Sequence, residues 1–302
     1  MKKIKQFFRY DNVGILFILP AFIYMMVFVG YPICSNIYLS FQDVSVKNLV
    51  NGERHFIGFD NYISLFQNEV FIKAMLNTLV FTIGSLFFQF LIGFALALFF
   101  TQKFKFAKAV RGILMVPWMM PMTVTALIFK LFFATDIGVL NHILSSLHII
   151  TENIDWLTNT KTAMIGVVVA NIWIGIPFNT ILLSTGLTTI SPELYESASV
   201  DGATGFQRLV YITIPLLRST IESVLVLGFI YTFKVYDLVY VMTEGGPVNS
   251  THLLSTYSYK LSFDMFKYSE GSAVANVLLI VLLLVGMIYM KITMEGEKQN
   301  DR

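Results

Sequence analysis

Long uncharged stretches of apolar residues recur along the chain and are separated by shorter polar segments. Six of these stretches cover approximately residues 13–33, 77–101, 112–133, 162–187, 216–242 and 271–291. Each is close to the length of about 20 apolar residues that a helix needs to cross the hydrocarbon core of a bilayer. The pattern predicts six transmembrane helices, of which the fifth is the weakest because Glu222, Lys234 and Asp237 fall inside it.

The composition supports a membrane location. Of the 302 residues, 56% are hydrophobic and only 13% are charged, whereas a soluble domain normally carries about 25% charged residues. These charges are too few to cover the surface of a water-soluble fold. We therefore expect an all-α integral membrane protein with a single membrane domain over residues 1–302. A net charge of +2 does not favour a nucleic-acid partner, and the single Cys and four scattered His residues predict neither a metal site nor a cofactor.

The positions of Lys and Arg predict the orientation of the helices. The segment between the second and third stretches contains Lys103, Lys105, Lys108 and Arg111 and no acidic residue, and four more basic residues precede the first stretch. Because short cytoplasmic loops are enriched in Lys and Arg, both termini are expected in the cytoplasm. The outer segments are then 35–76, which is long and polar enough for a small cap or an amphipathic helix around 61–71, and 135–161.

The inner segment 188–215, here called the elbow, carries a specific local pattern. Ser191 can cap a short helix that has Pro192 at its first position and Glu193 in its first turn. Asp201-Gly202 is a turn signal, and a second short helix is expected over 206–212. Pro215 suits the first turn of the fifth span. The pattern predicts a helix–turn–helix at the membrane surface, which could fit a groove on a soluble partner.

This segment resembles the EAA loop of binding-protein-dependent ABC importer permeases. The family pattern is Glu-Ala-Ala, three residues, Gly, nine residues and Ile-x-Leu-Pro, and here Glu196-Ser197-Ala198, Gly202 and Ile212-Thr213-Ile214-Pro215 stand at the same spacing. Ser197 and Ile214 depart from it conservatively. The turn Thr243-Glu244-Gly245-Gly246-Pro247 and the stretch Gly138-Val139-Leu140-Asn141 are similar to the carbohydrate-uptake group, especially to the first permease of maltose-like and glycerol-phosphate-like systems.

The resemblance implies a type I ABC importer permease fold in the bacterial cytoplasmic membrane, and a set of partners. These are a second permease subunit, two ATPase subunits that each receive one elbow, and an extracytoplasmic binding protein that delivers a carbohydrate. The ATPase-coupling residues that it implies are Glu193, Glu196, Ala198, Asp201, Gly202, Ile212 and Pro215. The chain has no phosphate-binding Gly-x-x-x-x-Gly-Lys-[Ser/Thr] motif, so we expect a transport subunit rather than an enzyme.

A face of the fifth span is our candidate for solute contact. Gly228, Tyr231, Thr232 and Val235 stand at i, i+3, i+4 and i+7 and form one stripe of a helix. Lys234 and Asp237 could line the same path or merely neutralise each other. The stripe is equally compatible with ordinary helix packing. Gly138, in the second outer segment, completes the candidate path residues.

Two other classes of function stay open at this point. A secondary transporter would normally need more spans or an internal repeat, and an intramembrane enzyme would need paired catalytic side chains that the spans do not show. The solute itself is open among oligosaccharides, disaccharides, polyols and sugar phosphates.

Overall fold

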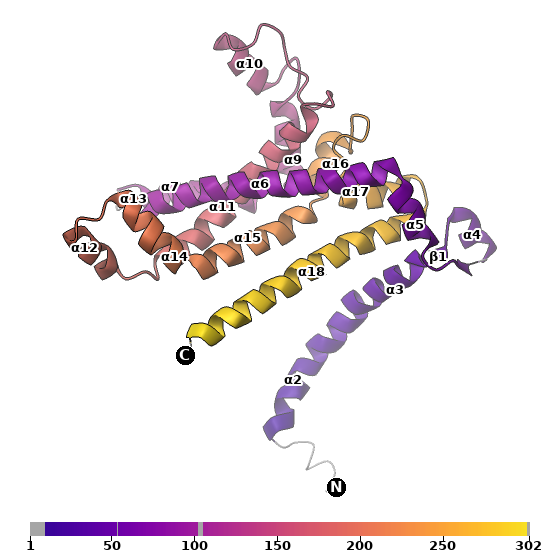
Figure 1. Ribbon diagram of the computed structural model, residues 1–302. Coiled ribbons are helices and arrows are strands. Elements are labelled where there is room, and N and C mark those ends of the chain that lie inside the picture. Colours follow the sequence, from indigo (N-terminus) through magenta and orange to yellow (C-terminus); the bar gives the residue numbers. More distant parts are fainter. Residues whose placement is uncertain (1–9, 53, 102–104, 301–302) are drawn as a thin grey trace. The chain divides into compact units, whose positions relative to one another are not determined.

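The computed structural model describes residues 10–52, 54–101 and 105–300. Within them the chain is predominantly helical, which confirms the predicted all-α class (Figure 1). Four helices are long and apolar enough to cross a membrane, and two bent helix pairs bring the number of candidate spans to six. The basic residues Lys2, Lys3, Lys5, Arg9 and Lys103, which contributed to the predicted orientation, lie outside the described residues.

The chain forms two compact units. The first comprises Met1–Leu65 and Ser258–Asn276, and the second Phe66–Tyr257 and Val277–Arg302. The elements of the first unit are α2 (Tyr10–Met25), the π-helical turn η1 (Met26–Gly30), α3 (Tyr31–Ser40), β1 (Gln42–Asp43), α4 (Val46–Asn51), β2 (His55–Phe56), α5 (Asp60–Gln67) and η3 (Lys260–Asp264).

A polar node holds the first unit together. Asn276 Nδ2 donates to Ser40 Oγ at 2.9 Å and to Tyr62 Oη at 3.1 Å, and Asn61 Nδ2 donates to the carbonyls of Ser40 and Gln42. These bonds fix the end of α3 next to the antiparallel pair β1–β2, in which Gln42 faces Phe56. The amphipathic helix predicted around 61–71 is present as α5, which begins at Asp60 and ends earlier than expected, at Gln67.

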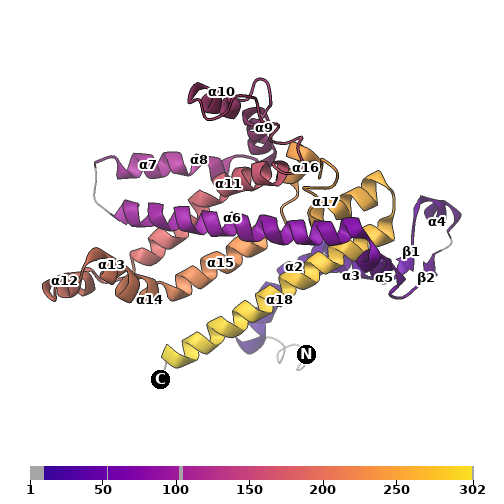
Figure 2. The same ribbon diagram turned by 45° about the horizontal axis from the view of Figure 1, so that its top comes forward.

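The second unit contains the remaining helices (Figure 2). They are α6 (Glu69–Thr101), α7 (Ala107–Leu114), α8 (Val116–Met119), α9 (Met122–Phe132), α10 (Val139–Ser146), α11 (Ala163–Leu187), α12 (Pro192–Val200), α13 (Gly205–Arg208), η2 (Leu209–Thr213), α14 (Ile214–Leu216), α15 (Arg218–Phe233), α16 (Asp237–Thr243) and α17 (Leu254–Tyr259). The helix α18 (Tyr268–Asn300) begins in the first unit and ends in the second.

The helices α6 and α11 form the most extensive pairing in the second unit. Glycines allow the two backbones to approach, as in many membrane interfaces. A Cβ at Gly93 would lie 2.6 Å from Asn179 Cβ and 3.2 Å from the backbone nitrogen of Thr180, and Gly175 packs directly against the side chain of Gln89. This pair, with α9, α15 and α16 packed along it, forms the frame of the unit.

The third predicted span is broken. Residues 109–119 and 122–132 are helical, but the two segments meet at 96°. Met120 is extended and Pro121 begins the next segment as its N-cap. Because proline lacks a backbone N–H and restricts the residue before it, the helix cannot continue through this position. Pro121 falls inside the predicted stretch 112–133, so the bend is the one that a proline within a span predicts.

The fifth predicted span is interrupted twice, by a bend near its start and by a break before its last residues. The helical segment 205–216 meets α15 at an angle of 70°. The helix α15 then ends at Phe233, and α16 begins only at Asp237. The expectation of one helix over 216–242 is therefore wrong, and the break at 234–236 separates Lys234 from Asp237.

Gly93→Ala tests the close approach of α6 and α11. The added methyl group meets backbone and Cβ atoms that cannot move aside, so we expect a loss of about 1–3 kcal/mol of stability and a lower midpoint of thermal unfolding of the detergent-solubilised protein. Gly84→Ala on the same helix is the matched control, since its Cβ would make only an ordinary contact at 3.9 Å with Val168. Equal midpoints for the two variants would contradict the close packing.

Candidate functional site

The first helix of the elbow, α12, begins as the sequence predicted. Ser191 is its N-cap, and its Oγ accepts a hydrogen bond from the Glu193 N–H at 3.3 Å. Pro192 occupies the first turn, where its missing N–H costs nothing. Glu193 and Glu196 are both exposed, so their carboxylates are free to meet a partner.

Gly202 ends α12 in a Schellman turn. Its φ is +81°, in the left-handed region that non-glycine residues rarely adopt. The N–H of Ala203 donates to the Ala198 carbonyl at 2.9 Å, and the N–H of Gly202 donates to the Ser199 carbonyl at 3.2 Å. No atom lies within 4 Å of the position that a Gly202 Cβ would take. The glycine is therefore required by the backbone and not by crowding.

The second helical segment is capped and tied to the first. Thr204 Oγ1 accepts from the Gln207 N–H and Gln207 Oε1 accepts from the Thr204 N–H, which is a capping box. The Tyr195 hydroxyl lies 3.0 Å from Thr213 Oγ1, and Arg208 Nη1 donates to Ser199 Oγ at 2.7 Å. These two cross-links hold the elbow in one shape.

The elbow presents both acidic and apolar groups at its surface. Asp201 is exposed together with the two glutamates, while Ala198 and Ile212 are half-buried. Besides Ile214 of the family pattern (40%), four large apolar side chains are exposed, namely Leu194 (46%), Val200 (88%), Phe206 (74%) and Tyr211 (77%). Apolar groups gathered beside charges are typical of a protein-binding surface, and the sequence reasoning had not singled these four out.

Pro215 does not begin the fifth span. It lies in α14, the last turn of the helical segment 205–216, just before the 70° bend. The π-helical turn η2 precedes it, with the Ile214 N–H bonded to the Leu209 carbonyl. The span itself starts at Arg218, whose guanidinium pairs with Glu222 at 2.8 Å.

A cavity of about 310 Å³, here called the Tyr231 cavity, lies within the second unit. Its lining includes Gly228, Tyr231, Thr232, Lys234, Val235 and Asp237, which are all the path residues predicted in span five. The structure brings them together with residues of α6, α8, α9 and α11. Its volume is within the range typical of small-ligand sites.

One wall of the Tyr231 cavity is aromatic. Trp118 stacks near Phe178 with ring centroids 6.2 Å apart, and Phe178 meets Tyr231 edge-on at 5.6 Å. Trp118 and Tyr231 remain 53% and 55% exposed in the chain. Lys234 Nζ lies 5.4 Å from the centre of the Tyr231 ring, within the range of a cation–π contact.

Another part of the lining is made of buried amides. Gln89, Asn171 and Asn179 are at most 4% exposed, and Gln89 Nε2 donates to the Asn171 carbonyl at 2.8 Å. Asn171 Nδ2 and Asn179 Oδ1 have no hydrogen-bond partner among the residues that the structure describes. Such groups are costly unless something satisfies them. The sequence carries a signal for this lining, because Asn171, Gly175 and Asn179 are spaced four apart within an apolar stretch.

Lys234 and Asp237 do not neutralise each other. Lys234 follows the last residue of α15 and Asp237 is the first residue of α16, so they do not share a helical face. No ion pair joins these two side chains. The expectation of a pair on one helix is wrong because the backbone turns between them, and both charged groups line the cavity.

Gly138 lies away from the Tyr231 cavity, and its position is set by the backbone. It is the N-cap of α10, where an added Cβ would collide with backbone atoms of Ala134 and Phe132. Its neighbour Asn141 clasps the segment 135–156: Nδ2 donates to the Thr135 and Ile154 carbonyls, and Oδ1 accepts from Trp156 Nε1 at 2.8 Å.

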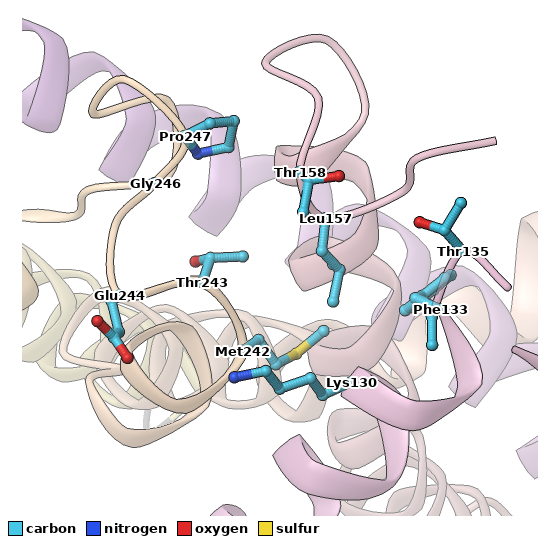
Figure 3. A pocket seen from close by; sticks show the side chains of 11 residues that line it. Lys130, Phe133, Thr135, Leu157, Thr158, Met242, Thr243, Glu244, Gly246 and Pro247 are labelled. Carbon is cyan, nitrogen blue, oxygen red and sulfur yellow. The ribbon is translucent and has the colours of Figure 1, made fainter. Parts of the chain in front are cut away.

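A second cavity, of about 470 Å³, lies where this clasped segment faces the turn after α16. Figure 3 shows Lys130 and Met242 on its floor, Pro247 on one side and Leu157 with Thr158 on the other. Lys130 Nζ donates to the Val241 carbonyl at 3.2 Å. We call it the Lys130 cavity.

Comparisons with known proteins agree with this arrangement. Residues 89–293 match the model of the family described as "Binding-protein-dependent transport system inner membrane component". A probable ABC transporter permease protein of Brucella suis biovar 1 is 32% identical over 281 residues, which are 93% of this chain and 96% of that protein. The trehalose/maltose transport system permease protein MalF of Thermococcus litoralis is 30% identical over 286 residues, covering 94% and 95% of the two chains.

A solved structure is also similar over nearly the whole chain. The crystal structure of a bacterial alginate ABC transporter, in complex with an alginate pentasaccharide-bound periplasmic protein, matches with a TM-score of 0.79 at 28% identity. The match covers 95% of this chain and 94% of that one. The chain thus belongs to the family of binding-protein-dependent transport system inner membrane components, as a permease of the ABC transporter type.

Proposed function

We propose that this chain forms half of the translocation path of an ATP-driven importer for a carbohydrate, and that the Tyr231 cavity contacts the solute. The observation that carries the proposal is the combination of an aromatic wall with buried amides that lack partners. Buried polar groups without hydrogen-bond partners lower the stability of a membrane protein unless a ligand binds them. Their position beside a cavity therefore favours a ligand that supplies hydrogen bonds.

A sugar ring matches both walls. Its C–H-rich face packs on Trp118 and Tyr231, while its hydroxyls can donate and accept at the same time. Amide side chains have both donors and acceptors, so Gln89, Asn171 and Asn179, which are buried in this structure, complete a hydroxyl's hydrogen bonds when the broken helices move apart during alternating access. Lys234 and Asp237 add one charge of each sign at the edge of the cavity.

The similar proteins support this class of solute. The permease of T. litoralis serves trehalose or maltose, and the alginate transporter was crystallised with a pentasaccharide-bound periplasmic protein. The sugars in these names differ in size and charge. The proposal therefore extends to the carbohydrate class and leaves the individual sugar among oligosaccharides, disaccharides, polyols and sugar phosphates.

The elbow supplies the coupling to ATP in this proposal. Two ATPase subunits each receive an elbow, one from this chain and one from a second permease subunit. The exposed acids of α12 meet basic groups of the ATPase, and the apolar side chains beside them fill its groove. Since Tyr195–Thr213 and Arg208–Ser199 hold the elbow rigid, a displacement of the ATPase passes to the 70° bend and from there to α15.

The orientation follows from the same proposal. The elbow is cytoplasmic together with both termini, so the segment that precedes α11 lies on the extracytoplasmic side. There a binding protein delivers the solute. The interruptions at 120–121 and 234–236 divide the helices that line the Tyr231 cavity, which allows their outer and inner parts to move separately during alternating access.

Gly202→Ala tests the elbow. A side chain in the left-handed region costs about 1–2 kcal/mol, so we expect several-fold less ATPase recovered with the tagged permease and a matching loss of uptake in proteoliposomes. Gly202→Asn should retain more of both, because Asn tolerates this conformation. Gly205→Ala is the matched control, since this glycine is also exposed and open but has no positive φ. Unchanged ATPase recovery and uptake for Gly202→Ala would contradict the proposed role of this turn.

Glu196→Lys tests the acidic face of α12. If the carboxylate meets a basic group of the ATPase, reversing its charge costs several kcal/mol at a desolvated contact, and ATPase recovery falls more than tenfold. Glu152→Lys changes an equally exposed acid far from the elbow and should leave recovery unchanged. ATP-independent uptake by the permease alone would instead favour a transporter driven by an ion gradient.

Asn171→Leu tests the solute contact. Removing a buried amide group without a partner should keep or raise the midpoint of thermal unfolding, yet lower uptake at least fivefold if the amide binds the solute. Thr82→Val is the control: Thr82 Oγ1 is likewise buried without a partner, but Thr82 does not line the cavity. Normal uptake by Asn171→Leu would exclude the amide from the path.

A further inference from the structure

The Lys130 cavity lies at the end of α11 that is opposite to the elbow. Its walls include Leu157 and Thr158, which precede the start of α11, whereas the elbow follows the end of that helix. A helix of 25 residues is about 38 Å long, which is enough to cross a bilayer. The cavity is therefore extracytoplasmic wherever the elbow is cytoplasmic, and it opens on the side from which the solute arrives.

Both walls of the Lys130 cavity are held in place by hydrogen bonds. Thr135 and the residues next to Leu157 are fixed by the Asn141 clasp. On the other side, Thr243 Oγ1 lies 2.7 Å from Thr251 Oγ1, which also lies 2.7 Å from the Gly246 carbonyl.

The turn 244–249 is also anchored to α6. Lys73 Nζ donates to the Val248 carbonyl at 2.9 Å, and Asn77 Nδ2 donates to the carbonyls of Asn249 and His252. Glu244, Val248 and Asn249 all have positive φ values, between 48° and 56°. Residues other than glycine keep such angles only when their surroundings impose them. The walls are thus preformed, and a partner that docks here pays little ordering entropy.

The chemistry of the lining favours a peptide over a sugar. The floor is apolar: Phe133, the one aromatic residue of the lining, and Met242 are only 3% and 2% exposed, so Leu157 and Pro247 supply most of its open apolar surface. A sugar would find no open ring face of the kind that Trp118 and Tyr231 present in the Tyr231 cavity. An apolar side chain of a protein loop, in contrast, fits such a floor.

The charges at the Lys130 cavity restrict which partner side chains can lie beside it. Lys130 and Glu244 are exposed, and neither forms an ion pair with another described side chain. A partner with one acidic and one basic side chain on either side of an apolar anchor would satisfy both. Opposite charges arranged in this way select the partner and fix its position more than they add affinity.

We propose that the Lys130 cavity is the docking site for a loop of the extracytoplasmic binding protein, with an apolar anchor residue flanked by an acidic residue for Lys130 and a basic residue for Glu244. The inference rests on the proposed importer function and its orientation. Docking here places the binding protein over α9 and α16, the two helices that also contribute Met122 and Asp237 to the Tyr231 cavity.

The test uses the complete transporter in proteoliposomes and the binding protein that stimulates its ATPase activity. Lys130→Glu and Glu244→Lys should each raise the binding-protein concentration for half-maximal stimulation about tenfold, with basal ATPase activity and maximal stimulation unchanged. Lys161→Glu is the matched control, because Lys161 is an exposed cation on the same side that does not line the cavity. Thr158→Trp should act like the charge reversals by filling the cavity.

An unchanged half-maximal concentration in Glu244→Lys and Thr158→Trp would overturn the docking site, even if Lys130→Glu failed to assemble. A change only in the dependence on solute concentration would overturn it as well and would make the cavity a sugar site. Stimulation of the wild-type transporter by its binding protein supports the importer function independently, so the two failures are distinguishable.

Discussion

The close approach of α6 and α11 is the constraint on which the rest of the second unit depends. Gly93 and Gly175 let the two helices pack without intervening side chains, and Gln89 then reaches the Asn171 carbonyl across the interface. In a bilayer there is no hydrophobic force between helices, so such packing and buried hydrogen bonds provide the association. With this pair fixed, α9, α15 and α16 have a surface against which to pack.

The same interface creates the cavity that we propose contacts the solute. Helices that approach so closely bring the amides of Gln89, Asn171 and Asn179 next to α15, where Gly228 again leaves room. An apolar interface would be more stable than one that leaves Asn171 Nδ2 and Asn179 Oδ1 without partners. Stability given up at a cavity is a common feature of functional sites, and here it agrees with a solute that brings hydroxyl groups.

The interruptions of the helices connect this site to its surroundings. Span three breaks at Pro121 and span five at 234–236, and both breaks lie beside the Tyr231 cavity. Each break leaves backbone groups that need protein or water partners, which a membrane protein tolerates only next to a cavity or inside the bundle. The elbow and the Lys130 cavity lie at opposite ends of α11, so the frame formed by α6 and α11 separates the two surfaces on which we propose that partners dock.

The sequence by itself determined the class of fold, the number of candidate spans and the shape of the elbow. These depend on local properties: hydrophobic length, the cap at Ser191, and the left-handed turn at Gly202, which form much the same way in any surroundings. The spacing of Glu196, Gly202 and Pro215 was enough to indicate the family. The stripe on span five follows from helical periodicity only as far as Thr232, because α15 ends at Phe233 and Val235 lines the cavity from the break that follows.

Only the tertiary structure decided where span five stops inside the membrane and which residues meet across the helix interfaces. Apolar composition does not reveal the break between Lys234 and Asp237, because both sides of the break are apolar and α16 meets α9 and α11 only in the folded chain. The aromatic wall of Trp118 and Phe178, and the amides of α6 and α11, come from segments far apart in the chain. Their meeting depends on how closely two helix backbones can approach, which is a property of the packed interface rather than of any single segment.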